Sequence, residues 1–340
     1  MSKILVILTG GTIGSCVQEK VISARAERSA QIVALYEKKY GKKDTFEVVQ
    51  PLNELSENLH PGNWEVIKKD LDTALEKDYD GIIITHGSDT LVYTSAFMAM
   101  LYAWIDVPVA VIAANYPLDD PRSNGMNNFA GAVSFTKEKA VTGVFTIYEN
   151  MNSEVEVFLP TRLLNSDPYF DQYRSFDRQV FGWIKDEKFV WNPDCPVTVD
   201  MINNREKSQH IDFEYKNEVL FIPAYLGINF RNYVCGEHVK AVVLSLYHSA
   251  TAPATASAGL LEFIENCNKE GIEVYGTSFK NPDMSCYQST HVLLQKGLKP
   301  LFNISDISSY VKLVLAYNQT RYGKEGLLEK SIYFESLEIV

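Results

Sequence analysis

The sequence predicts an α/β protein with two units, a larger N-terminal unit built on a parallel sheet and a smaller C-terminal unit. Two apolar runs, Ile4–Leu8 and Ile82–Ile84, lack the alternation of half-buried strands, as expected of parallel strands covered on both faces. Strand-like and helical segments alternate up to about residue 150, and again beyond a polar connector. A chain of 340 residues is long enough for two domains.

The larger unit, residues 1–190, has the strand–helix alternation of a flavodoxin-like fold. Apolar residues three or four positions apart, such as Trp64, Ile67 and Leu71, predict an amphipathic helix. In chain order we expect strand 4–8, a polar stretch 18–28, helix 29–40, strand 46–49, helix 64–77, strand 81–84, helix 90–104, and strands 109–113 and 143–148. This repetition predicts a parallel sheet with right-handed crossovers.

A change of composition separates the two units. Residues 191–217 contain Pro193, Pro196, the pair Asn203-Asn204 and several charges, which predict a connector. Beyond it, residues 218–340 alternate again and predict a smaller α/β unit. We expect strands over 219–222, 241–246 and 273–275, and helices over 255–269 and 289–296.

Composition excludes several classes of function. The net charge is −11 and there is no basic stripe, so a nucleic-acid partner is not expected. No apolar run approaches the roughly 20 residues that cross a bilayer, so no membrane partner is expected. The first strand begins at once and is too short for a signal peptide, which predicts a cytoplasmic protein. The five scattered cysteines and six histidines show no metal-ligand spacing, and they predict neither a disulfide framework nor a metal site.

Two short motifs carry the chemical signal. Thr9-Gly10-Gly11-Thr12-Ile13-Gly14 and Thr85-His86-Gly87-Ser88-Asp89-Thr90 each follow one of the two apolar strands directly. Open α/β sheets bind ligands at the carboxyl ends of their strands, so the two loops are expected to meet there. Hydroxyls, glycines and one carboxylate are the groups needed to attack an amide without a metal or a cofactor.

The first loop has competing interpretations. The dinucleotide pattern G-x-G-x-x-G is absent and no Gly-Lys-Ser/Thr follows, which excludes a Rossmann or Walker loop. A purely structural strand-to-helix turn remains open. In the catalytic interpretation, Thr12 is the nucleophile and the amides of Gly11 and Thr12 hold an oxyanion. Ser88 would relay a proton and Asp89 would hold a substrate ammonium, whereas His86 is expected to be a packing and hydrogen-bonding residue.

The two motifs together resemble the signatures of the bacterial-type L-asparaginase family, closest to its cytoplasmic type I branch. The similarity covers nearly the whole chain. It includes 51–57 followed by Pro61 and Trp64, 119–127, Thr161-Arg162, 287–297 and 304–312. The resemblance implies hydrolysis of L-asparagine to L-aspartate and ammonia without a cofactor. It also implies a homodimer or homotetramer, because active sites in this family form near a subunit interface.

The resemblance also implies roles for single residues. Thr12 matches the nucleophile, and Ser88 and Asp89 match the hydroxyl and the acid of the second motif. Ser56 matches the serine that binds the substrate's α-carboxylate. Gly11 and Gly87 belong to the same substrate-binding loops.

Four positions depart from the family pattern. Ser88 stands in place of threonine and keeps the hydroxyl. Arg162 replaces an activating lysine; arginine cannot act as a base, so it either polarises the hydroxyl or only pairs with Asp89 or another acid. Ile22 stands roughly where the family has a flap tyrosine. Glu57 follows Ser56 where a neutral residue is common, and it either grips an ammonium or faces solvent.

These departures keep two other functions open. A changed flap and Glu57 fit an amidohydrolase that acts on another amide, such as D-asparagine, glutamine or a peptide. Loss of the tyrosine and the lysine fits a non-catalytic protein that binds asparagine or aspartate. Because Thr12, Ser88 and Asp89 are all present, the sequence favours an L-asparagine amidohydrolase. A small polar site is expected to reject a longer substrate with misplaced groups.

Overall fold

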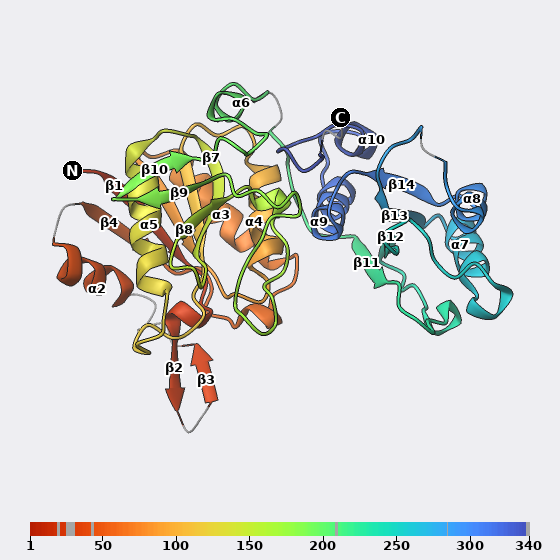
Figure 1. The fold of residues 1–340 in the computed structure, drawn as a ribbon, viewed down its shortest axis with the longest axis horizontal. Coiled ribbons are helices and arrows are strands. Elements are labelled where there is room, and N and C mark those ends of the chain that lie inside the picture. Colours follow the sequence, from red (N-terminus) through yellow and green to blue (C-terminus); the bar gives the residue numbers. More distant parts are fainter. Residues whose placement is uncertain (19–20, 25–30, 42–43, 208–209, 284, 338–340) are drawn as a thin grey trace. The chain divides into compact units, whose positions relative to one another are not determined.

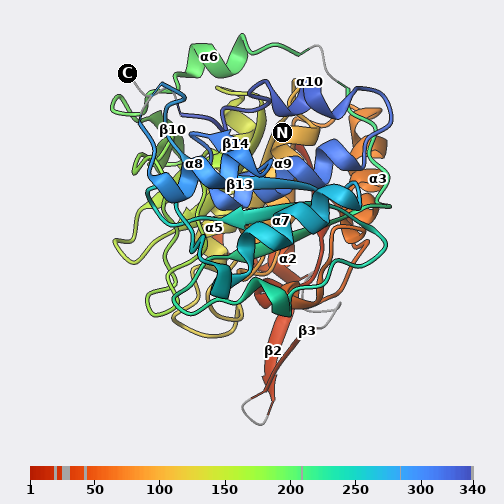
Figure 2. The same ribbon diagram turned by 90° about the vertical axis from the view of Figure 1, so that its right-hand side faces the viewer.

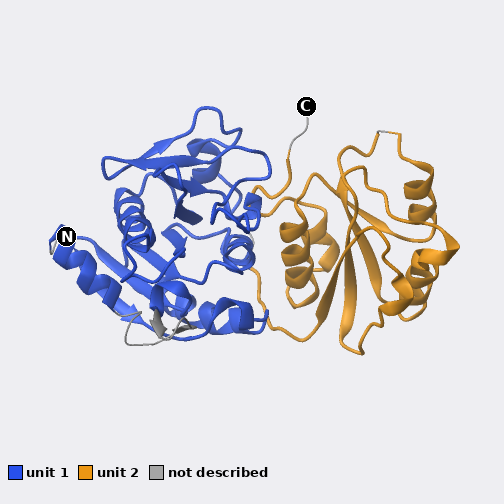
Figure 3. Cartoon of the chain, turned by 60° about the horizontal axis from the view of Figure 1, so that its bottom comes forward, with its two compact units in different colours: residues 1–210 blue, residues 211–340 orange. Residues whose placement is uncertain are grey.

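The computed structural model describes residues 1–18, 21–24, 31–41, 44–207, 210–283 and 285–337 (Figure 1), and the backbone alone for residues 16–18 and 21–24. The chain divides into two compact units, residues 1–210 and 211–340 (Figure 3). Each unit has its own sheet.

The larger unit contains most of the strands. Its elements are β1 (Lys3–Leu8), η1 (Thr12–Gly14), β2 (Ser15–Gln18), β3 (Val21–Ala24), α2 (Gln31–Tyr40), β4 (Thr45–Val49), η2 (Ser56–Asn58), α3 (Asn63–Leu75), β5 (Gly81–Thr85), α4 (Leu91–Leu101), β6 (Pro108–Ile112), α5 (Gly125–Glu138), β7 (Gly143–Glu149), β8 (Val155–Phe158), η3 (Pro160–Arg162), β9 (Gly182–Lys185), β10 (Lys188–Trp191) and α6 (Val199–Asn203). The predicted strands and helices up to residue 148 lie within these bounds to within a few residues.

The sheet of the larger unit has the order β10-β9-β8-β7-β6-β5-β1-β4. Its five parallel strands, β4-β1-β5-β6-β7, follow the flavodoxin-like order, in which the second strand in sequence lies outside the first. Every residue of β5 and β6 is buried. The helices α5 and α2 cover one face, and α3 and α4 lie on the other (Figure 1). The predicted fold class is therefore confirmed.

The sheet is not parallel throughout. The strands β8, β9 and β10 extend it as antiparallel neighbours beyond β7, which the sequence pattern did not indicate. Only Asn150–Glu154 separate β7 from β8, and a parallel crossover needs about a dozen residues or more. Asp186 and Glu187 join β9 to β10 with φ of 50° and 60°, the left-handed backbone of a two-residue hairpin turn.

The predicted polar stretch 18–28 contains a hairpin. The strands β2 and β3 pair with each other as a separate two-stranded sheet, with Ser15 opposite Ala24. Figures 1 and 2 both show this hairpin projecting from the larger unit. Part of the stretch, and the side chain of Ile22, lie outside the described residues.

The segment predicted as a connector begins inside the larger unit. Residues 191–210 belong to that unit, and α6 forms within them. Arg205 explains the attachment, because its guanidinium donates hydrogen bonds to the carbonyls of Ala103, Ile105 and Thr142. A charged side chain that satisfies three main-chain oxygens ties the segment to the loops before β6 and β7.

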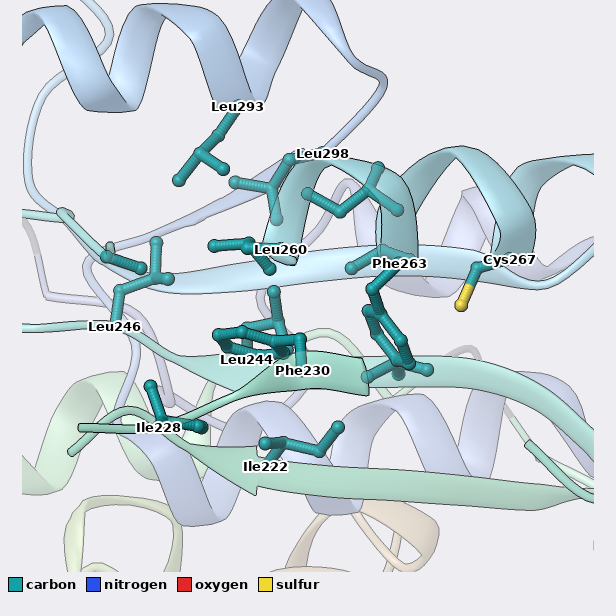
Figure 4. Packing of buried hydrophobic residues seen from close by; sticks show 14 of the residues in the cluster. Ile222, Ile228, Phe230, Leu244, Leu246, Leu260, Phe263, Cys267, Leu293 and Leu298 are labelled. Atoms are coloured by element: carbon teal, nitrogen blue, oxygen red, sulfur yellow. The ribbon is translucent and has the colours of Figure 1, made fainter. Parts of the chain in front are cut away.

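The smaller unit has a four-stranded parallel sheet in the order β11-β12-β13-β14. Its elements are β11 (Glu218–Pro223), η4 (Phe230–Asn232), β12 (Val239–Ser245), η5 (Ala256–Ala258), α7 (Leu260–Lys269), β13 (Glu273–Phe279), α8 (Gln288–Gln295), β14 (Lys299–Phe302), α9 (Asp306–Tyr317) and α10 (Lys324–Leu328). The helices α7 and α8 lie on one face and α9 on the other (Figures 1 and 2). An apolar cluster under α7 and α8 forms its core (Figure 4).

The helix predicted over 255–269 is shorter in the structure. It starts at Leu260, after the short helix η5 and Gly259. Gly259 has a φ of 70°, a left-handed conformation that interrupts a right-handed helix. The unit also contains β14, a strand that the sequence pattern did not indicate.

Candidate active site

The two motifs start side by side in the sheet. The strands β1 and β5 are parallel neighbours, with Leu8 paired to Thr85. The chain reaches β4 on one side of β1 and then β5 on the other, so the strand order reverses between these strands. Ligands of open α/β sheets bind at such a reversal, outside the carboxyl ends of the strands.

The first loop is fixed by the segment after β4. The Gly11 N–H donates to the Glu54 carbonyl at 2.9 Å, and the Glu54 N–H donates to the Thr9 carbonyl at 3.2 Å. The Ser15 hydroxyl donates to the Gly11 carbonyl at 2.8 Å. Thr12 begins η1 and remains partly exposed. The Gly11 amide is therefore already used inside the loop.

The two motif loops touch through their glycines. Gly11 has a φ of 72°, and a Cβ placed on it would lie 2.4 Å from the Gly87 nitrogen. A Cβ on Gly87 would lie 2.4 Å from the Ser56 Oγ. No side chain fits at such distances, so both positions require glycine. The contact brings the first motif, the second motif and the Ser56 segment together at one point.

Hydroxyl groups stabilise this meeting point. The Thr9 hydroxyl donates to the Thr85 carbonyl at 2.7 Å, which joins the ends of β1 and β5. The Thr90 hydroxyl donates to the Ser56 carbonyl at 2.9 Å, which joins the second motif to η2. The three loops are thus cross-linked by hydrogen bonds as well as by glycine contacts.

The predicted site residues differ in exposure. Thr12 and Ser88 are partly exposed and Asp89 is exposed, so a small ligand can reach them. Ser56 is buried at 3% exposure against Gly87. Glu57, one residue further along, is exposed. The arrangement offers two reachable hydroxyls and a carboxylate around a glycine-lined contact.

His86 is wholly buried behind the second loop. Its Nδ1 lies 2.9 Å from the Gly87 carbonyl oxygen, and because a carbonyl only accepts, Nδ1 carries the proton. Burial lowers the pKa of His86 to about 4, so the ring is neutral at physiological pH. His86 therefore holds the Gly87 backbone in place.

Arg162 forms a buried ion pair that the sequence did not reveal. Its Nη1 lies 2.6 Å from the Asp177 Oδ2, and the two side chains are only 5% and 8% exposed. The adjacent chain adds a backbone contact, in which the Phe176 N–H donates to the Arg162 carbonyl at 2.8 Å. The acid predicted to pair with Arg162 was Asp89 or another one, and Asp177 is the partner seen here.

Tyr173 supports the second loop and was also missed. Its hydroxyl donates to the Ser88 carbonyl at 2.6 Å. Burial, followed by Tyr148 and the Asp89 charge, raises the pKa of Tyr173 well above its ordinary value, so the hydroxyl stays protonated and donates. Asn150 fixes the tyrosine backbone by exchanging two hydrogen bonds with it at 2.9 Å. Nothing in the local sequence links position 173 to position 88.

Neither a metal cluster nor a membrane-spanning helix is found among the described residues. Within that part of the chain, no three His, Cys, Asp or Glu side chains form a group that could hold a metal ion. Over the same part, no helix has the length and apolar character needed to span a membrane.

Comparison with known proteins identifies the family. The family model described as "Asparaginase, N-terminal" matches residues 3–194, more than half of the chain. The chain therefore belongs to the asparaginase family, as its motifs predicted.

The curated relatives include a glutamyl-tRNA(Gln) amidotransferase subunit of Metallosphaera sedula, which is 25% identical over 94% of this chain and 72% of its own length. The corresponding amidotransferase subunit of Saccharolobus islandicus (strain M.14.25) has the same identity and coverage. These relatives carry a different name from the asparaginase that the motifs suggest.

Two solved structures share the fold. The L-asparaginase of Thermococcus kodakarensis superposes with a TM-score of 0.78 at 22% identity, covering 99% of this chain and 100% of that one. L-asparaginase I of Vibrio cholerae superposes with a TM-score of 0.77 at 21% identity, and the match covers 99% of each chain. At these identities the likeness establishes the architecture, and the family assignment supports an amidohydrolase.

Proposed function

We propose that this protein hydrolyses the side-chain amide of L-asparagine to give L-aspartate and ammonia, with Thr12 as the nucleophile. The observation that carries the proposal is the contact of Gly11 with Gly87 and of Gly87 with Ser56. It brings the first motif with Thr12, the second motif with Asp89 and the Ser56 segment together at the carboxyl edge of β1 and β5.

In the proposed reaction, the Thr12 hydroxyl attacks the amide carbon and forms a covalent ester with the aspartyl group. The Thr12 and Ser88 amides stabilise the oxyanion. Ser88 relays the threonine proton to the leaving nitrogen, and ammonia departs. Water then hydrolyses the ester and restores Thr12, so no cofactor is consumed.

The remaining groups position the substrate. We assign Ser56 to the α-carboxylate and the exposed Asp89 to the α-ammonium. We propose that Glu57, which is exposed, makes a second contact with the same ammonium. Arg162 cannot take up the threonine proton, so we assign it a fixed positive charge held by Asp177. We further propose a homodimer or homotetramer that works in the cytoplasm.

A second candidate function follows from the curated relatives. They are named as amidotransferase subunits and align over 94% of this chain. For this candidate we propose glutamine as the ammonia source and a working form that includes a partner subunit. D-asparagine or a peptide amide, and ligand binding without turnover, are the other outcomes that the altered positions 22, 57 and 162 allow.

Ammonia release separates these candidates. The purified chain is incubated with L-asparagine, L-glutamine, D-asparagine and asparagine dipeptides. We expect turnover of L-asparagine, and a loss of at least about 10³-fold in Thr12→Ala because the nucleophile is removed. The matched control is Thr73→Ala, an exposed helix threonine whose hydroxyl donates to the Lys69 carbonyl. It should retain activity.

The other outcomes reassign the function. Turnover of glutamine alone favours the amidotransferase function, and turnover of another amide favours a changed specificity. A ligand-induced rise in melting temperature without ammonia from any substrate indicates a binding protein. Undiminished turnover by Thr12→Ala would contradict the proposed nucleophile.

A further inference from the structure

Two cysteines meet in the smaller unit, where the sequence predicted no disulfide. The Sγ atoms of Cys235 and Cys267 lie 3.8 Å apart. Cys267 is on α7 beside Phe263 in the apolar cluster (Figure 4). Cys235 lies between η4 and β12, in a segment without helix or strand, and packs against the same cluster.

Both cysteines line one open pocket. It has a volume of about 370 Å³, and its wall includes Arg231, Glu262 and Glu270. Cys267 is 3% exposed, whereas Cys235 is partly exposed. A small reagent that enters the pocket therefore meets Cys235 first and finds Cys267 behind it.

We propose that Cys235 and Cys267 form a modification site, a dithiol that small-molecule disulfides such as oxidised glutathione convert into an intramolecular disulfide. Bonded sulfurs lie about 2 Å apart, so this pair must close by about 1.8 Å. The neighbouring Gly236 gives the segment room to move, because a Cβ there would meet nothing within 4 Å.

The exchange proceeds in two balanced steps. The Cys235 thiolate attacks one sulfur of oxidised glutathione, its S–S bond breaks, and one glutathione thiolate leaves. The Cys267 thiolate then attacks the Cys235 sulfur of this mixed disulfide and releases the second glutathione. The two cysteine protons end on the two glutathione thiols, and the protein gains one disulfide.

The surroundings make the two thiols slow to react. Burial, followed by the neighbouring Cys235, raises the pKa of Cys267 to about 12. Burial also raises the pKa of Cys235, and Glu270 adds to this effect. Because the thiolate is the reacting form, oxidation is expected over minutes to hours. Once formed, the disulfide closes a loop of roughly 30 residues and joins the segment before β12 to α7.

Mass spectrometry of the full chain tests the proposal. After treatment with oxidised glutathione, we expect a linked Cys235–Cys267 peptide whose mass is lower by two hydrogens. The oxidised chain should melt roughly 5–10 °C higher than the reduced chain. Cys286→Ser is the matched control, because Cys286 is exposed and lies outside the pocket. It should give the same linked peptide.

A trapped intermediate sharpens the test. In Cys267→Ser, Cys235 should retain one glutathione, because no second thiol displaces it, and the melting temperature should not rise. If both cysteines of the unaltered chain remain free thiols while Cys286 is glutathionylated, the proposal is wrong. In the unaltered chain, a disulfide from Cys235 or Cys267 to any other cysteine of the protein would contradict it equally.

Discussion

The main sheets of the two units are both rich in parallel strands, yet only one of them carries the proposed active site. In the larger unit the strand order reverses between β1 and its neighbours β4 and β5, and the loops after β1 and β5 meet at that point. In the smaller unit the order β11-β12-β13-β14 never reverses. Strand order, rather than parallel pairing alone, creates the place where a ligand can bind.

The side chains at the carboxyl ends of the strands also differ between the two sheets. At the larger sheet, glycines allow three loops to touch and leave Thr12, Ser88 and Asp89 reachable. At the smaller sheet, the Ser245 hydroxyl donates to the carboxylate of Asp306 at 2.6 Å, and Asp306 is the first residue of α9. The Ser245 hydroxyl is therefore part of the structure, whereas the hydroxyl-bearing residues Thr12 and Ser88 remain partly exposed.

The largest expected effect compares the two buried ion pairs. Arg162–Asp177 lies in the larger unit, and Lys312–Glu335, 5% and 0% exposed, lies in the smaller one. Asp177→Asn and Glu335→Gln should each lower the free energy of unfolding by about 3–5 kcal/mol, because each leaves a buried cation without its carboxylate. Urea denaturation measures this loss.

Ammonia release by the folded fraction separates the two pairs. We expect it to fall in Asp177→Asn and to be unchanged in Glu335→Gln. If both variants kept the activity of the native chain, the Arg162–Asp177 pair would have no part in the reaction.

The next effect concerns acid stability. His86 is neutral in the folded protein with a pKa near 4, against 6.5 for an ordinary histidine. The unfolded chain therefore binds a proton first as the pH falls. The contribution of neutral His86 to the free energy of unfolding is complete above pH 6.5. It decreases by about 3 kcal/mol as the pH falls to 4.

His86→Asn, which can still donate to the Gly87 carbonyl, should remove this dependence. The free energy of unfolding is measured for the native chain and for His86→Asn at several pH values between 7 and 4, and the difference between them gives the contribution of His86. His291→Asn, an exposed change on α8 of the smaller unit, is the control. A constant difference between the native chain and His86→Asn over that range would show that His86 does not titrate as described.

A smaller effect compares two glycines with nearly the same φ. Gly11 and Gly271 have φ of 72° and 73°, but only Gly11 has neighbours within reach of a Cβ. Alanine at Gly271 should cost about 1 kcal/mol through its backbone alone. Alanine at Gly11 should cost about 2 kcal/mol more, because it also forces the two motif loops apart.

Ammonia release is the second measurement on these glycine variants. We expect Gly11→Ala to lose activity and Gly271→Ala to keep it. Equal losses of stability in the two variants would mean that the glycine contact does not hold the site together.

The smallest effect is that of one hydroxyl. Tyr173→Phe removes the donor to the Ser88 carbonyl, and should lower the unfolding free energy by about 1 kcal/mol and kcat several-fold. Tyr275→Phe in the smaller unit removes a hydrogen bond to Glu273 of 3.0 Å and should change stability alone. Steady-state kinetics check this, and a fall in kcat for both variants would argue against a positioning role.

Much of the larger unit was predictable because buried parallel strands have a plain signature. The apolar runs of β1 and β5 end at glycine- and hydroxyl-rich motifs, so the meeting of these loops could be inferred from sequence alone. The resemblance of the motifs indicated the family and predicted Ser56 as a site residue.

Other features depend on contacts that no local pattern records. The strands β8 to β10 are short and include charged residues such as Glu156 and Lys188, which hide their strand character. Asp177 and Tyr173 act on residues 15 and 85 positions away. Only the folded chain shows that Asp177 pairs with Arg162 and that Tyr173 holds the Ser88 backbone.

The most direct test of the account is a crystal structure of Thr12→Ala with L-asparagine bound. The account predicts the side-chain amide beside position 12, the α-carboxylate at Ser56 and the α-ammonium at Asp89, all at the carboxyl edge of β1 and β5. Asparagine bound elsewhere, or with Asp89 and position 12 contacting separate ligands, would contradict it.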